Sequence, residues 1–529
     1  MSAIRLETAS FAASVGRSHG RARIKRALAI IIAAGALILP LTFTIALTDV
    51  FALPKTVVML GLSVLLLAGL LRLVSRRSAT RSGRLSAITV ALALYLVLTA
   101  VATLRSADPY HSLIGENLQY QGFLATLGYA VAFLAARRSL GDMRHVRRLF
   151  AVIVAGAVLV AGYGILQQVG LDPIWHVLDR GRIFSTLGQA NALAAYLVLC
   201  LPIALAIAGA TRTVGRTISA LAAVAIAAAL ALTLSRGGYL GTGTALVVFV
   251  ACVGPRSILT RRRVAIGAGV ALVTLVSIVV FPPLTRSVER VVDRGMLAAD
   301  LGESSTASHL DLLAVGVRVA LDYPFFGVGP EIYPAVFARY RDVVLPPARA
   351  AVMAHFRPES PQDVPLAIAD GAGLPALAAY IAVIVLAMLA GWRRLRQGSP
   401  HERWLLAALM AALAGHVVTD LFMTAEITGS WIFWVLLGVL CATRASEERS
   451  PPVIENVPAA ARSERTANRS RRLSCAGEAP RGRRGRRGAA PGQIVGRGTP
   501  SRNRPVALLL SPRPSTDIPT VSGSTASKP

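Results

Sequence analysis

Long uninterrupted apolar runs recur through most of this 529-residue chain. Each run is about 17–22 residues long, the length that an α-helix needs to cross ~30 Å of hydrocarbon. The runs are apolar on every side, whereas a surface helix of a soluble protein has one polar face. Hydrophobic residues make up 54% of the chain and charged residues only 16%. The sequence therefore predicts an all-α polytopic membrane protein.

The runs predict about 12 membrane-spanning helices in two groups. The first group occupies residues 27–281, with helices at about 27–47, 55–74, 86–104, 120–136, 149–167, 191–210, 217–234, 239–254 and 264–281. The second group occupies residues 366–445, with helices at about 366–391, 404–421 and 429–445. The polar interval 282–365 between the groups predicts one large loop, which contains helices of its own.

The basic residues of the short loops predict the orientation in the membrane. The five short loops on the side of residues 1–26 hold about 19 basic residues, against about five in the opposite short loops. Basic loops stay in the cytoplasm, so both termini are expected there and loop 282–365 is expected outside. The first run is long and lacks a small-residue cleavage site, which favours an uncleaved first helix over a signal peptide. We expect a multi-pass protein of the inner, cytoplasmic membrane.

The tail at 446–529 has a different composition, rich in arginine, glycine, proline and serine. Such a segment cannot bury a core, and we expect a disordered cytoplasmic tail that touches membrane lipids. Although the chain carries a net charge of +29, the tail has no aromatic residue on which a base could stack. Specific nucleic-acid binding is therefore not expected. The four cysteines lack metal-ligand spacing, so neither a metal site nor a disulfide framework is predicted.

Arg182 lies just before the start of the predicted span at 191–210. Backbone N–H groups at a helix start, together with a nearby guanidinium, can bind a phosphate. Asn191 could equally well act as a simple cap of the same helix.

Arg236 lies between two predicted spans that leave it almost no loop. Gly237 and Gly238 would permit a turn with positive φ and a close backbone approach. The arginine either contacts an anion at the loop side of the membrane or reaches the lipid headgroups.

Residues 308–322 of the large loop have the pattern of an amphipathic helix. Its apolar stripe is predicted to consist of Leu310, Leu313, Ala314, Val317 and Leu321. Arg318 has Asp322 one turn away, so either a helical salt bridge or a functional anion contact is possible. Segment 324–330, PFFGVGP, predicts a rigid turn; its Gly327-x-Gly329 is only a weak phosphate signal.

Four stretches, in this order, resemble the O-antigen ligase and polymerase superfamily of bacterial membrane glycosyltransferases. They are RIFSTLGQANALAAYLVLCLPIAL (182–205), LTLSRGGYLG (232–241), SHLDLLAVGVRVALDYPFFGVGPEIYPAVFARYR (308–341) and SPQDVPLAIADGAGLPALAAY (360–380). The resemblance covers roughly residues 27–445 and excludes the tail. Its motifs are moderately specific together and weak singly.

The resemblance implies a GT-C-like fold and an inverting transfer. A glycan would pass from a polyprenyl-pyrophosphate carrier to a lipid or glycan acceptor, without nucleotide sugar, metal or other cofactor. The positions that match the family's pyrophosphate-binding arginines are Arg182, Arg236 and Arg318. A planar guanidinium binds phosphate oxygens in pairs and stays charged beside lipid, which suits this role.

The chain departs from the family at Gln362-Asp363, where a His-Asn type of pair is common. Histidine is the proposed base or leaving-group contact of the family, and glutamine cannot titrate. Asp363, Glu359 or His355 could take over, and we favour Asp363. Gln189 likewise stands where asparagine is frequent.

Two other classes of function stay open from the sequence. One is a transporter of a small solute such as bicarbonate, for which His416 and Asp420, one turn apart in a predicted span, are the best evidence. The other is a non-catalytic protein of envelope assembly, because the expected histidine is missing. The sequence does not distinguish ligation from polymerisation and does not identify the glycan.

Overall fold

The computed structural model describes residues 2–75, 86–174, 181–211, 214–254 and 304–442. Within these ranges every regular element is a helix, which confirms the all-α prediction. The described residues all belong to one compact unit, 1–451. The predicted span at 264–281, the first part of the loop and the basic tail lie outside the described residues.

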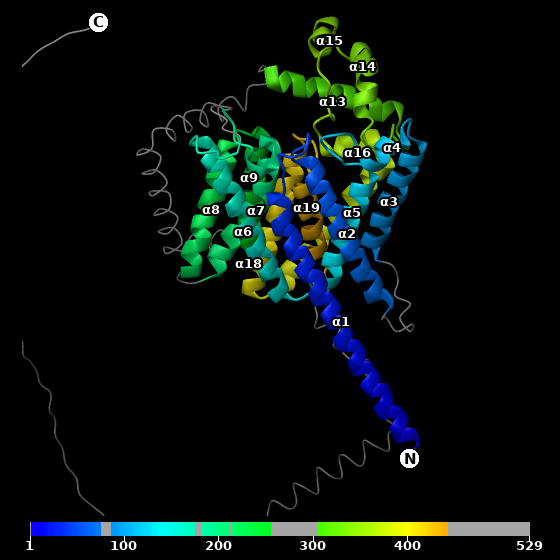
Figure 1. Cartoon of the computed structure of the whole chain (residues 1–529), viewed down its shortest axis with the longest axis vertical. Helices are drawn as coiled ribbons and strands as arrows, with labels where there is room; N and C mark the ends of the chain where they lie inside the picture. Colours follow the sequence, from blue (N-terminus) through cyan, green and yellow to red (C-terminus); the bar gives the residue numbers. More distant parts are fainter. Residues whose placement is uncertain (1, 76–85, 175–180, 212–213, 255–303, 443–529) are drawn as a thin grey trace, which may run out of the picture. The chain divides into compact units, whose positions relative to one another are not determined.

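The helices follow the predicted spans closely along the chain (Figure 1). Before the large loop they are α1 (Ser2–Leu41), α2 (Ala52–Ser75), α3 (Ala87–Arg105), α4 (Pro109–Ile114), α5 (Phe123–Ser139), α6 (Met143–Gln168), the 3-10 turn η1 (Ser185–Leu187), α7 (Ala190–Ala210), α8 (Val214–Leu232) and α9 (Arg236–Val253). In the loop and after it they are α13 (Ser304–Asp322), α14 (Tyr333–Val344), α15 (Pro347–Met353), α16 (Val364–Ala372), α17 (Leu374–Gln397), α18 (Pro400–Asp420) and α19 (Ile427–Leu440).

Eight of the described helices are long and apolar enough to cross a membrane: the 19–41 part of α1, and α2, α3, α6, α7, α8, α9 and α17. This confirms a polytopic membrane protein. Helices α5, α18 and α19 correspond to three further predicted spans but are not among the eight. The number 12 therefore stays a prediction.

Chain connections and contacts place one set of helix ends together, which we call the loop end of the bundle. It includes the end of α3 at Arg105, the start of α9 at Arg236 and the end of α18 at Asp420. Helices α13 and α14 pack on α16 at this end, and Figure 1 shows α13, α14 and α15 grouped there. The loop end therefore collects the polar segments that the sequence singled out.

The predicted span at 366–391 is not one helix, and this part of the prediction is wrong. The segment breaks at Gly373, which has φ +87° and separates α16 from α17. A helix end leaves backbone groups without partners, and in hydrocarbon these must be satisfied by protein. The turn at 324–329 does this: N–H groups of Val328 and Gly329 donate to the carbonyls of Asp370 and Gly371. The hydrogen bonds at the break thus hold the large loop against the bundle.

The apolar stripe predicted for the loop helix is also wrong. In α13 the buried residues are Leu312, Val315, Val319 and Ala320, whereas Leu310, Val317 and Leu321 are exposed. The reason is a second small core inside the loop, where Leu312, Val315, Tyr333, Phe337, Leu345, Ala350 and Met353 pack together. The buried face of α13 is the one that packs into this small core. The spacing of apolar residues along the sequence did not identify that face.

We predict that Gly373→Ala destabilises the protein. A Cβ at this position would overlap the backbone oxygen of Phe325, and a left-handed φ costs a non-glycine residue about 1–3 kcal/mol. Gly243→Ala in α9 is the matched control, because nothing lies within 4 Å of its Cβ position. Thermal unfolding in detergent should show a lower midpoint for Gly373→Ala only. Equal midpoints would contradict the tight seat of the loop.

Candidate functional site

Arg182 ties the start of α7 to the end of α8. Its Nε donates to the carbonyl of Thr233 at 2.8 Å and its Nη2 donates to Oδ1 of Asn191 at 2.7 Å. Asn191 is therefore not the cap of α7: the cap position is Gln189, without a side-chain bond. Because Thr233 comes three residues before Arg236, this contact brings the two predicted arginines to the same turn.

Arg236 is half-buried at the first position of α9, directly after its cap. The Ser235 hydroxyl accepts from the N–H of Gly238 at 3.2 Å. The left-handed φ of this turn belongs to Leu234 and not to the two glycines, so the predicted turn conformation is wrong. The predicted close approach is confirmed, because a Cβ on Gly237 would lie 2.7 Å from the Phe422 side chain.

Helices α9 and α18 pack together closely enough to fix the arginine turn against the end of α18. A Cβ on Gly415 would lie 2.6 Å from the carbonyl of Gly241, so only small residues fit at this crossing. Oγ1 of Thr419 also donates to the carbonyl of Gly237 at 3.4 Å. The start of α9 and the end of α18 therefore form one rigid corner at the loop end.

Phe422, just past α18, links this corner to the large loop. Its ring stacks on the imidazole of His309 in α13, with centroids 6.0 Å apart and planes 27° apart. The same histidine interacts with the Gln362 side chain, the Asp363 carboxylate and the Leu421 backbone. Sequence reasoning missed His309. Its spacing of seven residues from Gly316, which packs on Leu366 of α16, places both on one face of α13 and is a signal that could have found it.

Gln362 and Asp363 lie at the start of α16, beside His309. Asp363 caps that helix by accepting the N–H of Leu366 at 2.7 Å. Gln362 has φ +56°, a left-handed conformation that is rare for a residue with a side chain. Its N–H donates to the Ser360 hydroxyl, which contacts the Thr424 hydroxyl after α18 at 2.7 Å. The segment that departs from the family pattern is therefore held in a defined and strained geometry.

Burial shifts the pKa values of His309 and Asp363, the two titratable groups beside Gln362, in opposite directions. It lowers the pKa of His309, an effect that Gln362, Asp363 and the Leu421 backbone partly oppose. It raises the pKa of Asp363, which the Leu366 N–H and His309 partly oppose. A histidine with a lowered pKa is neutral at pH 7, and a carboxylate with a raised pKa is a stronger base. The pair is thus suited to accept a proton.

The remaining predicted site residues lie elsewhere. Arg318 is nine residues from His309, which places it on the opposite face of α13. Its side chain is 54% exposed and pairs with Asp322 at 3.2 Å, the salt bridge offered as the alternative interpretation. His355 is exposed beyond α15, and Glu359 accepts from Nε2 of Gln119 at 3.0 Å. Arg318 therefore lies on the face of α13 away from His309.

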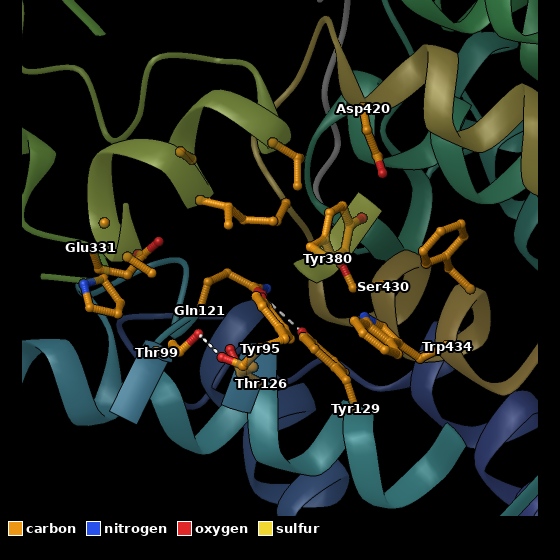
Figure 2. Close-up of a pocket in the computed structure, with 18 of the residues that line it drawn as sticks. Tyr95, Thr99, Gln121, Thr126, Tyr129, Glu331, Tyr380, Asp420, Ser430 and Trp434 are labelled. Carbon is orange, nitrogen blue, oxygen red and sulfur yellow. Dashed lines mark hydrogen bonds between the residues drawn. The ribbon is translucent and has the colours of Figure 1, made fainter. Parts of the chain in front are cut away.

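A cavity of about 100 Å³ lies beneath α16, bounded also by α3, α5, α17, α18 and α19 (Figure 2). His416 and Asp420 line it, with Nε2 of His416 3.5 Å from Oδ1 of Asp420. Nδ1 of His416 faces the carbonyl of Ala195 at 3.3 Å and must carry a proton to bond it. The pair lies in the last turn of α18, at the loop end of that helix.

Among the described residues, no group of three or more His, Cys, Asp or Glu side chains could hold a metal ion. Three of the cysteines are in the described part, and each is a free thiol. The polar groups that the site does offer are two arginines, a His–Gln–Asp cluster and the His416–Asp420 pair.

The fold and the site define a helical polytopic membrane protein whose polar groups converge at one end of the bundle. Residues 221–355 match the family model described as O-Antigen ligase. The match confirms the resemblance to the O-antigen ligase and polymerase superfamily, and it includes Arg236, His309 and Arg318. A comparison with curated proteins gives no match.

Taken together, the family match and the apolar helices support a multi-pass inner-membrane enzyme of polysaccharide assembly. Partners that are lipids or glycans are consistent with that class.

We predict that Arg182→Lys lowers thermal stability while Arg318→Lys does not. Arg182 makes two charge-assisted hydrogen bonds to the protein, each worth roughly 1.5–3 kcal/mol, and lysine cannot make both in the same geometry. An exposed helical pair such as Arg318–Asp322 contributes about 0.3–0.5 kcal/mol. Thermal unfolding of the two purified variants tests this. A loss of stability confined to Arg318→Lys would contradict the assignment of Arg182 as a link between α7 and α8.

Proposed function

We propose that the protein is an O-antigen ligase-like glycosyltransferase. It transfers or polymerises glycan from a polyprenyl-pyrophosphate carrier during assembly of a cell-surface polysaccharide. The reaction takes place at the loop end of the bundle, on the extracytoplasmic side that the basic loops predict.

One observation carries this proposal: Phe422 contacts both the turn that carries Arg236 and the imidazole of His309, which lies beside Asp363. Gly237, next to Arg236, packs on one part of Phe422, and His309 stacks on its ring. Asp363 lies beside His309, and Asp420 lies close enough to Asp363 for the two carboxyl groups to repel. Transfer of a glycan from a pyrophosphate to a hydroxyl group needs both kinds of side chain. Cations stabilise the leaving group, and a base takes the proton of the nucleophile.

Arg182 and Arg236 form the donor side. Guanidinium groups stabilise charge that grows on the pyrophosphate as it departs, an effect that is strong where water is excluded. Arg182 donates two hydrogen bonds to the protein, which hold its guanidinium beside the α8–α9 turn, where we propose that it contacts a phosphate oxygen. Arg318 stays a proposed third contact, although its place on the far face of α13 favours a smaller role.

Asp363 is the proposed base on the acceptor side, with His309 beside it. The acceptor oxygen forms a bond to the anomeric carbon while the bond from that carbon to the pyrophosphate oxygen breaks. The electron pair leaves with the pyrophosphate, and the acceptor proton passes to Asp363. Attack opposite the leaving group inverts the anomeric carbon. Gln362, which cannot titrate, positions the cluster through its contact with His309.

Two features bear on the transporter alternative. His416 and Asp420 are in the last turn of α18 and border the proposed acceptor side, rather than standing alone in mid-membrane. The break between α16 and α17 resembles the broken helices of transporters, but those occur in paired repeats. Within the described residues this break is filled by the 324–329 turn, so it serves to seat the loop.

The envelope glycans of a deletion strain test the proposal. Loss of glycan from an acceptor that normally carries it indicates a ligase, and shortened chains indicate a polymerase. Unchanged glycans would contradict the proposed function and favour the transporter or the assembly protein.

Complementation of that strain with site variants tests the residues. Asp363→Asn keeps the helix cap, since asparagine also caps, but removes the base; we expect transfer to fall by about 10²–10⁴. Gln362→Ala should cost far less. His309→Phe keeps the stacking ring, and its combination with Asp363→Asn should be no worse than Asp363→Asn alone, because groups that act as a unit are not additive.

The pH profile provides a second test of Asp363. Its raised pKa means that the carboxylate is lost, as pH falls, at a higher pH than the ordinary value of 3.8. Transfer should therefore decline on the acid side above that value, and this limb should be absent from the residual activity of Asp363→Asn. A normal rate for Asp363→Asn, or a gain of activity in Gln362→His, would remove Asp363 from the mechanism.

A further inference from the structure

Most of the side chains that line the cavity beneath α16 have no role in the proposed glycan transfer. At about 100 Å³ it exceeds the roughly 10–15 Å³ that one water molecule needs, so it accommodates a much larger group. Its wall combines aromatic rings with hydroxyl, amide and carboxyl groups (Figure 2). A cavity of this kind in a membrane bundle is costly unless something polar fills it.

Three aromatic rings form one side of the cavity. The Tyr95 ring stacks on Trp434 with centroids 6.1 Å apart and planes 15° apart. The Tyr380 ring lies 5.7 Å from Tyr95 and 6.0 Å from Trp434. All three residues are at most 6% exposed, so their packing fixes them as a rigid apolar platform.

Two polar side chains of the cavity wall each have an atom without a hydrogen-bond partner. Within the part of the chain that the structure describes, Nε2 of Gln121 and Oε2 of Glu331 are buried and make no hydrogen bond. Oε1 of Gln121 accepts from the Tyr129 hydroxyl at 2.8 Å, which fixes the amide so that its NH₂ is the free donor. Burying a polar group without a partner costs about 1–3 kcal/mol. A ligand that forms hydrogen bonds with these two atoms would remove this cost.

Glu331 is held at the cavity by a strained backbone. Its φ of +62° is left-handed, a conformation that persists in a non-glycine residue only where the surroundings impose it. Burial raises the pKa of Glu331 to about 8, so the carboxyl group is mostly protonated at pH 7 and can both donate and accept. The residue next to it, Pro330, also lines the cavity, which places the loop at its rim.

The chemistry of the wall selects the ligand. Among the described residues that line the cavity none is lysine or arginine, so the wall offers a phosphate group no permanently charged cation. An isoprenoid chain would leave Nε2 of Gln121 and Oε2 of Glu331 without a hydrogen-bond partner. A sugar ring satisfies both sides, since its C–H face packs on aromatic rings and its hydroxyl groups pair with an amide and a carboxyl.

We propose that this cavity binds a sugar ring of the acceptor, between the Tyr95–Tyr380–Trp434 platform and the Gln121 and Glu331 side chains. Val364, which follows Asp363 in the chain, lines the cavity, so a sugar bound there lies next to the segment that carries the proposed base. Only the identification of the bound sugar as the acceptor rests on the proposed function. The binding of a sugar can be measured without any transfer.

The test is saturation-transfer NMR on the full-length protein, purified in a detergent without a sugar headgroup. The probes are methyl glycosides of common hexoses and of N-acetylhexosamines, each at millimolar concentration. We expect transfer of saturation to the ring protons of at least one glycoside, with binding roughly 3- to 10-fold weaker in Gln121→Leu, since one hydrogen bond is lost. Gln119→Leu, two residues away and outside the cavity wall, is the matched control and should bind as wild type.

Absence of binding for every glycoside would overturn the inference, as would equal binding by wild type and Gln121→Leu. The outcomes separate the two proposals: no sugar binding with altered glycans in the deletion strain removes only the sugar cavity. Sugar binding with unchanged glycans in that strain removes only the proposed transfer.

Discussion

Backbone hydrogen bonds across the break at Gly373 hold the large loop on the bundle, and the site depends on them. Hydrocarbon leaves no water for the carbonyls that a broken helix frees, so the 324–329 turn must supply their donors. This docking lays α13 on α16 and brings His309 to Gln362 and Asp363. A strict backbone requirement thus positions side chains that come from distant parts of the chain.

The second constraint is the close crossing of α9 and α18. Gly241 and Gly415 allow backbone contact, which fixes the Arg236 turn against Phe422. Phe422 then contacts both the turn that carries Arg236, through Gly237, and the imidazole of His309, which lies beside Asp363. In the proposed reaction a cation serves the leaving group and a carboxylate serves the nucleophile in a single step.

The sequence predicted most of the fold because run length and composition determine whether a helix can span a membrane. It also singled out Arg182, Arg236 and Asp363 as candidate site residues, since charged residues at the ends of apolar runs are conspicuous. It failed where tertiary packing decides: the buried face of α13 and the break at Gly373 both depend on contacts with distant segments. His309 was missed for the same reason, because only docking on α16 gives that histidine its neighbours.

Release of polyprenyl pyrophosphate by purified protein in vesicles, supplied with a polyprenyl-pyrophosphate glycan and a glycan or lipid acceptor, tests the central claim most directly. Arg236→Lys keeps the charge but loses the planar fork, and we expect about 10²-fold less polyprenyl pyrophosphate released at unchanged thermal stability. Arg105→Lys is the matched control, because Arg105 also lies at the loop end but stacks on Phe326, with its guanidinium carbon 5.2 Å from the ring centroid. Release by Arg236→Lys at the wild-type rate would contradict a donor site at the α8–α9 turn.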